Sequence, residues 1–108
     1  MQPHSIHDFQ EWFQVIQTSE RSQVAMMELA PGQSTGDEAE SHPESDQVLL
    51  VVEGAVKGEI DGKNVWVGHG QFIIVPANTP HRFFNDGPEP AITFNVYAGP
   101  AYPHDAKG

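Results

Sequence analysis

Glycine and proline occur so often in this chain that they leave little room for a long helix. The 108 residues include ten glycines and nine prolines. Turn-forming residues return roughly every eight to twelve positions, a spacing typical of short strands joined by turns. Proline removes a backbone donor, and glycine loses much conformational freedom when it is ordered, so both favour turns over the interiors of helices and strands. The sequence therefore predicts an all-β fold in which helix is minor.

The segments between the turns are rich in β-branched and aromatic residues, which favour strands. Strands are predicted over residues 22–32, 47–54, 71–76, 81–85 and 91–98, and a hairpin over residues 58–68. Asp61-Gly62 lies within that hairpin and is a pair typical of two-residue turns. Residues 33–46 are acidic and are predicted to form a loop. Such a series of short strands indicates a sandwich or a jelly roll.

Two segments have a less regular pattern. Phe9–Gln17 fits either a short helix or a strand, and a strand is favoured because Phe13 and Val15 would then share one face, with Ile16 on the other. The apolar run over residues 48–52 does not alternate with polar residues, so both of its faces are expected to be covered. In a chain this small, a second subunit is one means of covering the outer face.

The charge balance excludes several classes of partner. The net charge is −10, with only five lysines and arginines, so little is available to neutralise the phosphates of nucleic acid or of an anionic membrane surface.

The chain has no cysteine, which excludes disulfides and thiolate metal sites. No run approaches the roughly 20 apolar residues that span a bilayer. The N-terminus lacks the pattern of a secretory signal, so we expect a cytoplasmic protein.

A series of glycine, proline and histidine residues in the second half of the chain is more specific. Gly70 is followed after five residues by Pro76, then by Asn78, by His81 and, after three more residues, by Asn85. This spacing resembles the second motif of the cupin superfamily, except that the motif has glycine where this chain has Asn78. Asparagine is among the residues that tolerate a positive φ, so the turn is expected to survive the change.

The first cupin motif is matched less completely. Counted back from Gly54, the glutamate position of the motif is Gln47, its second histidine is His42 and its first histidine is Glu40. Counting forward from Gly32 instead gives Glu38 and Glu40, two residues out of register, so an insertion near Gly36 is expected.

The resemblance implies a fold and an assembly. The fold is a cupin jelly-roll β-barrel, or double-stranded β-helix, formed by residues 1–108 as a single domain and paired into a homodimer. The barrel core would span about residues 24–98. Residues 99–108 contain two prolines and would form an extended C-terminal tail.

The resemblance also implies a metal site. Carried over residue by residue, the ligands would be Glu40, His42, Gln47 and His81. Two imidazoles and a carboxylate can form a facial triad with open positions. A divalent transition metal (Fe, Mn, Ni or Zn) is therefore the expected cofactor, with a small polar molecule as ligand or substrate.

Three further residues are predicted to line the pocket beside the metal. Phe83 and Asn85 would share a strand face with His81, because side chains two residues apart point the same way. Leu49, two residues after Gln47, is the third.

Each of these candidate residues also has a simpler interpretation that involves no metal. His42 fits a solvated loop residue before Pro43, the acidic residues around it fit a soluble face, and Gln47 fits a hydrogen-bonding group without metal. His69 is expected in an exposed turn, and the histidines near the termini, His4, His7 and His104, are expected to be solvated. Arg82 is expected to pair with surface carboxylates. The aromatic residues are expected in the core, namely Trp66, Phe72, Phe83 and Phe94.

Three functions remain open from the sequence. The first is a metal-dependent cupin enzyme, such as a dioxygenase, an isomerase or a lyase. The second is a non-catalytic module that binds a metal or a small ligand. The third, a jelly roll without a working pocket, predicts apolar residues at the motif positions and is the least compatible with Glu, His, Gln and His.

Overall fold

Eight β-strands form the framework of the computed structural model, which describes residues 2–108. In chain order they are β1 (Phe13–Thr18), β2 (Gln23–Leu29), β3 (Asp46–Glu53), β4 (Ala55–Ile60), β5 (Lys63–Gly68), β6 (Phe72–Val75), β7 (His81–Phe84) and β8 (Ala91–Ala98). The described residues contain no helix, and so none with the length and hydropathy needed to span a bilayer. The all-β prediction is confirmed.

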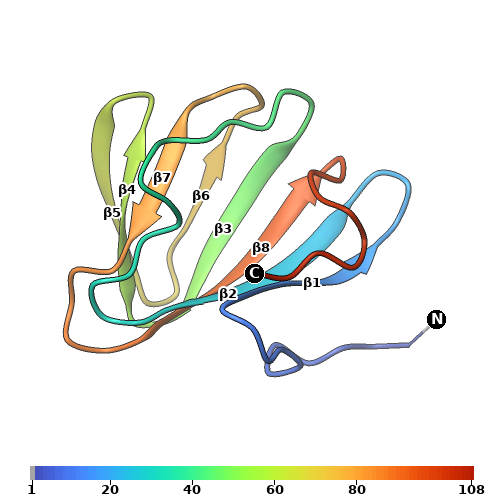
Figure 1. Cartoon of the computed structure of the whole chain (residues 1–108), viewed down its shortest axis with the longest axis horizontal. Coiled ribbons are helices and arrows are strands. Elements are labelled where there is room, and N and C mark those ends of the chain that lie inside the picture. The colour runs from blue at the N-terminus through green and yellow to red at the C-terminus, as the bar shows by residue number, and fades with distance from the viewer. Residues whose placement is uncertain (1) are drawn as a thin grey trace.

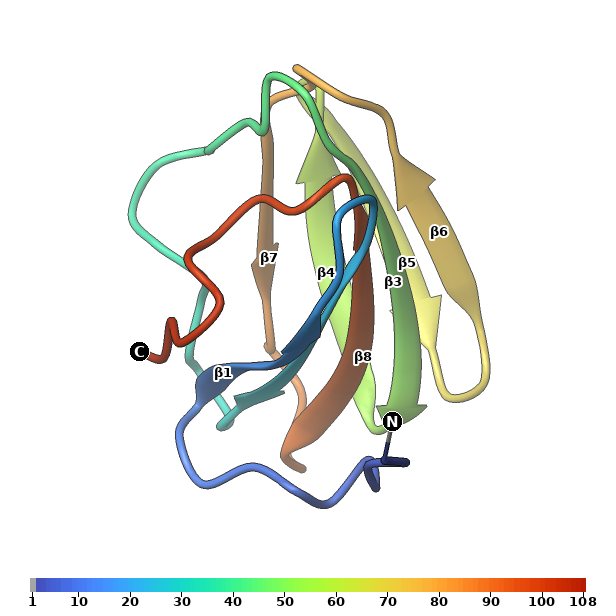
Figure 2. The ribbon, with the colours of Figure 1, turned by 90° about the vertical axis from the view of Figure 1, so that its right-hand side faces the viewer.

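The strands form two antiparallel sheets (Figures 1 and 2). One has five strands in the order β1-β2-β8-β3-β6, and the other has three in the order β5-β4-β7. The main hydrophobic core lies between the sheets, because its buried side chains come from both: Leu49 and Val51 from one, Val56, Val67 and Phe83 from the other. Side chains on alternate positions of each strand fill this space.

The predicted barrel is not closed. On the open side, the chain between β2 and β3 runs along β7 and pairs with it only at isolated bridges, Ser34 with Phe84 and Glu40 with His81. Residues 36–39 lie between the backbone bonds of Thr35 to Phe83 and of Glu40 to His81, whereas only Arg82 lies between those two partners on β7. The extra residues loop away, so this segment does not form a ninth strand that would join the sheets.

Two turns have the backbone that their residues predict. Asp61 and Gly62 have φ values of 50° and 77°, and Ile60 pairs with Lys63, which is the geometry of a two-residue hairpin. Asn78 has φ 61°, so asparagine occupies a left-handed position that the cupin motif fills with glycine.

The first strand is a strand and not a helix, but it begins at Phe13, four residues later than expected. The C-terminal residues 99–108 pack beside it. Val15 donates a backbone hydrogen bond to Ala106, and Gly108 donates one to Phe13. The side chain of Gln23 binds the backbone of Ala101 and Tyr102. The tail is therefore held against the five-stranded sheet.

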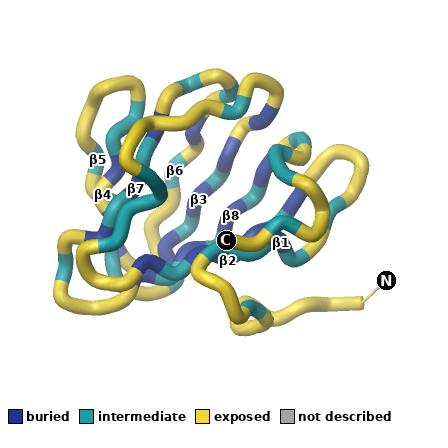
Figure 3. The backbone as a smooth tube through the Cα atoms, viewed as in Figure 1, coloured by how far each residue is buried: buried dark blue, intermediate teal, exposed yellow. Residues whose placement is uncertain are grey.

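The prediction that Trp66 and Phe72 lie in the core is wrong. Their side chains are 62% and 69% exposed, and Ile74 is 57% exposed. Strand alternation explains this, because β5 and β6 turn these residues away from the space between the sheets. Buried and partly exposed residues also alternate along β3 and β8 (Figure 3). A single subunit therefore covers only the inner face of the apolar run in β3.

Gly54 is expected to be much less replaceable than Gly62. Both have positive φ, but a Cβ on Gly54 would lie 2.5 Å from the carbonyl oxygen of Pro90, whereas a Cβ on Gly62 would meet nothing within 4 Å. Gly62→Ala should lower the free energy of unfolding by about 1 kcal/mol, the usual left-handed penalty, and Gly54→Ala by more than about 2 kcal/mol because a clash is added. Urea unfolding followed by tryptophan fluorescence would measure both. Equal losses would contradict this account of the β3–β4 turn.

Candidate metal centre

His81 is the most tightly held residue of the site. It is the first residue of β7 and is 2% exposed. Its Nδ1 lies 2.8 Å from the carbonyl oxygen of Thr79. A carbonyl accepts only, so Nδ1 carries the proton and Nε2 presents its lone pair. Such a carbonyl contact is a common way of fixing the tautomer of a metal-binding histidine.

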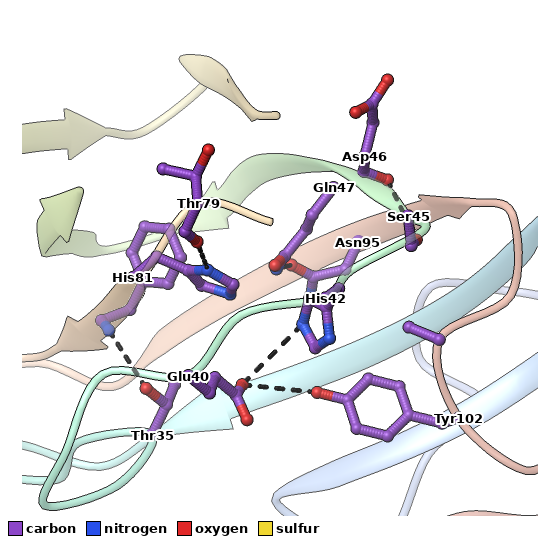
Figure 4. A network of polar contacts seen from close by, with 12 residues as sticks. Thr35, Glu40, His42, Ser45, Asp46, Gln47, Thr79, His81, Asn95 and Tyr102 are labelled. Carbon is purple, nitrogen blue, oxygen red and sulfur yellow. Dashed lines mark hydrogen bonds and ion pairs between the residues drawn. The ribbon is translucent and has the colours of Figure 1, made fainter. Parts of the chain in front are cut away.

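The acidic segment before β3 brings two more side chains to the same place. Glu40 and His81 exchange two backbone hydrogen bonds, of 2.9 and 2.8 Å, and the amide of Asn78 donates to the carbonyl of His42 at 2.8 Å. The turn around Asn78 therefore positions both His81 and His42. Figure 4 shows Glu40, His42 and His81 pointing toward one another.

The ligand atoms of these three residues are close enough to share one ion. They all lie within 4.8 Å of one another. His42 Nε2 lies 4.0 Å from Glu40 Oε1, and the two imidazole centroids are 5.0 Å apart. Zinc and similar ions bind nitrogen and oxygen at about 2.0–2.2 Å, so atoms that share one ion lie on the order of 3–4 Å apart. Small rearrangements would bring the three groups to that spacing.

Gln47 contributes an oriented oxygen from the start of β3. It is 3% exposed, and its Nε2 donates to Asn95 Oδ1 at 3.1 Å. Asn95 Nδ2 in turn donates to Thr93 Oγ1 at 2.9 Å. Because Asn95 presents its oxygen to Gln47, the amide nitrogen of Gln47 must face Asn95 and its Oε1 must face away.

The polar atoms that lack partners fit a metal ion. Among the described residues, three buried side-chain atoms make no hydrogen bond: His42 Nε2, His81 Nε2 and Gln47 Oε1. Buried polar atoms are normally satisfied, so each exception needs an explanation. All three are lone-pair donors at predicted ligand positions, and an acceptor such as a cation would satisfy them together. The residues present therefore fit a divalent metal.

A cavity of about 230 Å³ opens beside these groups. Glu40, Gln47 and His81 lie in its wall with Thr35 and Met27, and the rest of the wall is aromatic: Trp12, Phe13, Phe83, Tyr97 and Tyr102. Phe83, one of the three residues predicted to line the pocket, is part of this wall. His42 borders a neighbouring depression with Pro43 and Pro100.

The other two predicted pocket residues lie outside this wall. Leu49 is fully buried in the main core. Asn85 is 2% exposed, and its Nδ2 donates to the carbonyls of Leu29 and Glu89 while its Oδ1 accepts from Gly87. Asn85 therefore links β2 to the loop before β8. Strand alternation gave the correct inward direction for both residues, but it could not tell the cavity from the solid core beside it.

Sequence reasoning missed several residues of the site. Tyr97 and Asn95 are two residues apart, so strand alternation places them on one face of β8, but alternation alone does not tell which face points inward. Tyr102 comes from the tail, and its hydroxyl donates to Glu40 Oε1 at 3.4 Å. The pairing of Gln47 with Tyr97 across β3 and β8 places Tyr97 there. Only the register between distant strands carries that information.

The remaining predicted residues lie away from the centre. His4, His7, His69 and His104 are all exposed. Arg82 Nη1 lies 3.3 Å from Glu59 Oε1, as expected for a pair of surface charges.

Burial shifts the titration of the site. Desolvation lowers the pKa of His42, the carboxylate of Glu40 opposes this, and His81 lowers the pKa further. Burial raises the pKa of Tyr97 and of Tyr102. Both tyrosines are therefore neutral phenols at physiological pH, and His42 favours the neutral form that can bind a metal.

Comparison with known proteins gives a family match across most of the chain. A family model for the cupin domain matches residues 25–97. The chain is 33% identical to the uncharacterized protein YrkC of Bacillus subtilis (strain 168), over 83% of this chain and 53% of YrkC. It is 34% identical to the tetracenomycin polyketide synthase protein TcmJ of Streptomyces glaucescens, over 65% of this chain and 46% of TcmJ. The chain thus spans about half the length of these curated relatives.

Among solved structures, the crystal structure of BH2720 from Bacillus halodurans is similar over nearly the whole chain. The TM-score is 0.85 at 27% sequence identity, and the match covers 94% of this chain and 80% of that one.

We expect the metal-free protein to lose stability as the pH falls from 7 to 5. The pKa of His42 is lowered in the folded state from its ordinary value of 6.5, so below pH 6.5 the unfolded chain binds the proton more readily and the equilibrium shifts toward unfolding. Denaturant unfolding at several pH values, with a chelator present, would measure the slope. His42→Gln should flatten it, whereas an unchanged slope would contradict the assignment to His42.

Proposed function

The chain belongs to the cupin superfamily, and we propose that it binds one divalent transition metal ion through His42, His81 and Glu40, next to a cavity that takes a small molecule. The observation that carries this proposal is the set of three unpartnered buried atoms, two of them imidazole Nε2 atoms, beside ligand atoms of Glu40, His42 and His81 that lie within 4.8 Å of one another. Two imidazoles and one carboxylate suit iron, manganese, nickel or zinc, and three protein ligands leave positions for a small molecule.

Gln47 would act as a weak fourth ligand or as a hydrogen-bond acceptor for a metal-bound water. Its Oε1 is already turned toward the site by Asn95. An amide oxygen is neutral and a weaker donor than a carboxylate, so we propose a centre that holds its ion less tightly than one with a glutamate at this position.

The bound metal would supply a Lewis acid that polarises an oxygen of the small molecule. The protein would supply orientation, through the aromatic walls, and exclusion of water. These features support an enzyme of the dioxygenase, isomerase or lyase kind.

A second candidate function is binding without turnover. Glu40 is the only carboxylate among the described residues of the cavity wall. If it holds the metal, no further carboxylate is left there to act as a general base. The tyrosines do not replace it, because burial raises their pKa values.

Untagged protein is expected to bind a transition metal at roughly one ion per chain. His42→Ala and His81→Ala should each weaken binding by more than about 100-fold, since even outer-shell partners of metal ligands contribute about 10–100-fold. Elemental analysis and calorimetric titration with zinc would measure stoichiometry and affinity. His69→Ala removes an exposed histidine and should change neither. Full metal retention in the His42→Ala, His81→Ala double variant would refute the site, provided that its circular dichroism shows an intact fold.

We further propose that two copies pair through the outer face of the five-stranded sheet. Phe72 and Ile74 on β6 are 69% and 57% exposed, and they pair across the ladder with Leu50 and Val48 of β3. Both of these neighbours are apolar and only partly buried. A continuous apolar patch of this kind marks an interaction surface in a soluble protein. A two-fold dimer would use the same patch on both subunits.

The dimer proposal predicts that Phe72→Asp yields a monomer. A buried carboxylate without a partner is costly, and a two-fold interface would contain it twice. Sedimentation velocity at micromolar concentration would measure the mass. Ile6→Asp alters another exposed apolar residue, one that is 39% exposed and outside the strands, and should leave the dimer intact. A monomeric native chain would disprove the proposal.

A further inference from the structure

Five of the ten residues in the wall of the cavity have large aromatic side chains. Trp12, Phe13, Phe83, Tyr97 and Tyr102 line it. Several of them pack on one another, with ring centroids 6.0 Å apart for Trp12 and Phe13, 4.9 Å for Phe13 and Tyr102, and 5.2 Å for Tyr97 and Tyr102. Aromatic rings attract other rings through offset or edge contacts. The wall thus favours a flat ligand that can lie against rings.

The tail keeps this wall in place. Gln23 is 1% exposed, and its amide binds the backbone of Ala101 and Tyr102 through three hydrogen bonds of 2.8–3.0 Å. Tyr102 is therefore a fixed side of the cavity, although it follows the last strand. A preformed wall costs little to order when a ligand binds.

The described wall of the cavity has no cationic side chain that could hold a multiply charged ligand. No lysine or arginine is among the described residues of its wall. Arg82, the neighbour of His81, is turned to Glu59, and Lys57 is paired with Asp86 at 3.0 Å. Phosphate and dicarboxylate ligands are usually held by arginine or lysine, so the wall is unsuited to them.

The volume limits the size of the ligand. The cavity measures about 230 Å³, whereas an engineered cavity of about 150 Å³ holds one benzene molecule. One ring or two fused rings therefore fit.

The end of the cavity formed by Glu40, Gln47 and His81 determines which ligand charge is favoured. A divalent cation beside the carboxylate of Glu40 has one net positive charge, because the imidazoles and Gln47 are neutral. A buried site of this kind favours a ligand with one negative oxygen over a ligand with none or two.

We propose that the cavity binds a flat compound of one or two rings with a single acidic hydroxyl, a phenol or a ring enol, which loses its proton to solvent as the oxygen meets the metal. The hydroxyl oxygen lies at the end formed by Glu40, Gln47 and His81, and the ring lies against Trp12 and Tyr102. This inference rests on the proposed metal site and names the class of ligand that the site takes.

Calorimetric titration of the zinc-loaded protein would test the ligand class. The probes are 2-naphthol, its fully saturated analogue decahydro-2-naphthol, and oxalate as a dianion. Zinc binding is titrated first, so that failure of the metal site is seen separately. We expect 2-naphthol to bind at least about 10-fold more tightly than either other probe, a gain consistent with ring stacking. Repetition in buffers of different ionisation enthalpy should show release of about one proton, because the site favours the ligand with one negative oxygen.

Matched variants test the aromatic wall. Trp12→Ala should weaken 2-naphthol binding by about 10-fold or more, the range of one aromatic contact, without changing the zinc stoichiometry. Trp66→Ala removes the other tryptophan, which is exposed on β5, and should have no effect. If zinc binds but oxalate or the saturated alcohol binds as tightly as 2-naphthol, the ligand class is wrong. If 2-naphthol binds equally well without zinc and releases no proton, the role of the hydroxyl is wrong.

Discussion

The pair of backbone hydrogen bonds between Glu40 and His81 is the constraint on which the site depends. These residues are 41 positions apart in the chain, and the pairing gives them adjacent places on the open side of the two sheets. It also fixes His42, whose carbonyl accepts from the turn that precedes β7. Because the same segment loops away at residues 36–39, the molecule remains open there. Incomplete closure and a site at the opening thus have one cause, which is a segment too long to pair throughout.

Orientation inside the site is set by a chain of hydrogen bonds from the sheet outward. Thr93 accepts a hydrogen bond from Asn95, and Asn95 accepts one from Gln47. The direction of the Gln47 amide is therefore determined by Asn95 and, through it, by Thr93. His81 is oriented in the same way by Thr79. Side-chain positions that are held by such partners cost little entropy to use in binding. Replacement of the usual glutamate by Gln47 changes the charge of the site but leaves an oxygen facing it.

The sequence predicted those features that depend on local chemistry. Strand positions follow from turn residues and β-branched segments, and the left-handed turn at Asn78 follows from the tolerance of asparagine for positive φ. The spacing of His42, Gln47 and His81 was enough to bring them together as candidates. Features that depend on the register between distant strands could not be predicted from the sequence. Tyr102 reaches Glu40 because Gln23 holds the tail. Trp66 and Phe72 are exposed because no described residue of this chain covers the outer faces of the two sheets.

Strand β3 shows how the two proposed roles of the molecule are kept apart. Gln47 faces inward to the candidate metal centre, and Leu49 and Val51 follow it into the core. The intervening residues, Val48 and Leu50, face outward beside Ile74 and Phe72. A shift of one residue in the pairing of β3 would bury Val48 in the site and expose Gln47 on the apolar face. The inner face of β3 requires Gln47 at the metal centre, and the outer face requires its apolar side chains. The candidate metal centre and the outer apolar surface therefore specify the same pairing register of β3. A long apolar run, which by itself predicts only a covered strand, can therefore serve two functions at once.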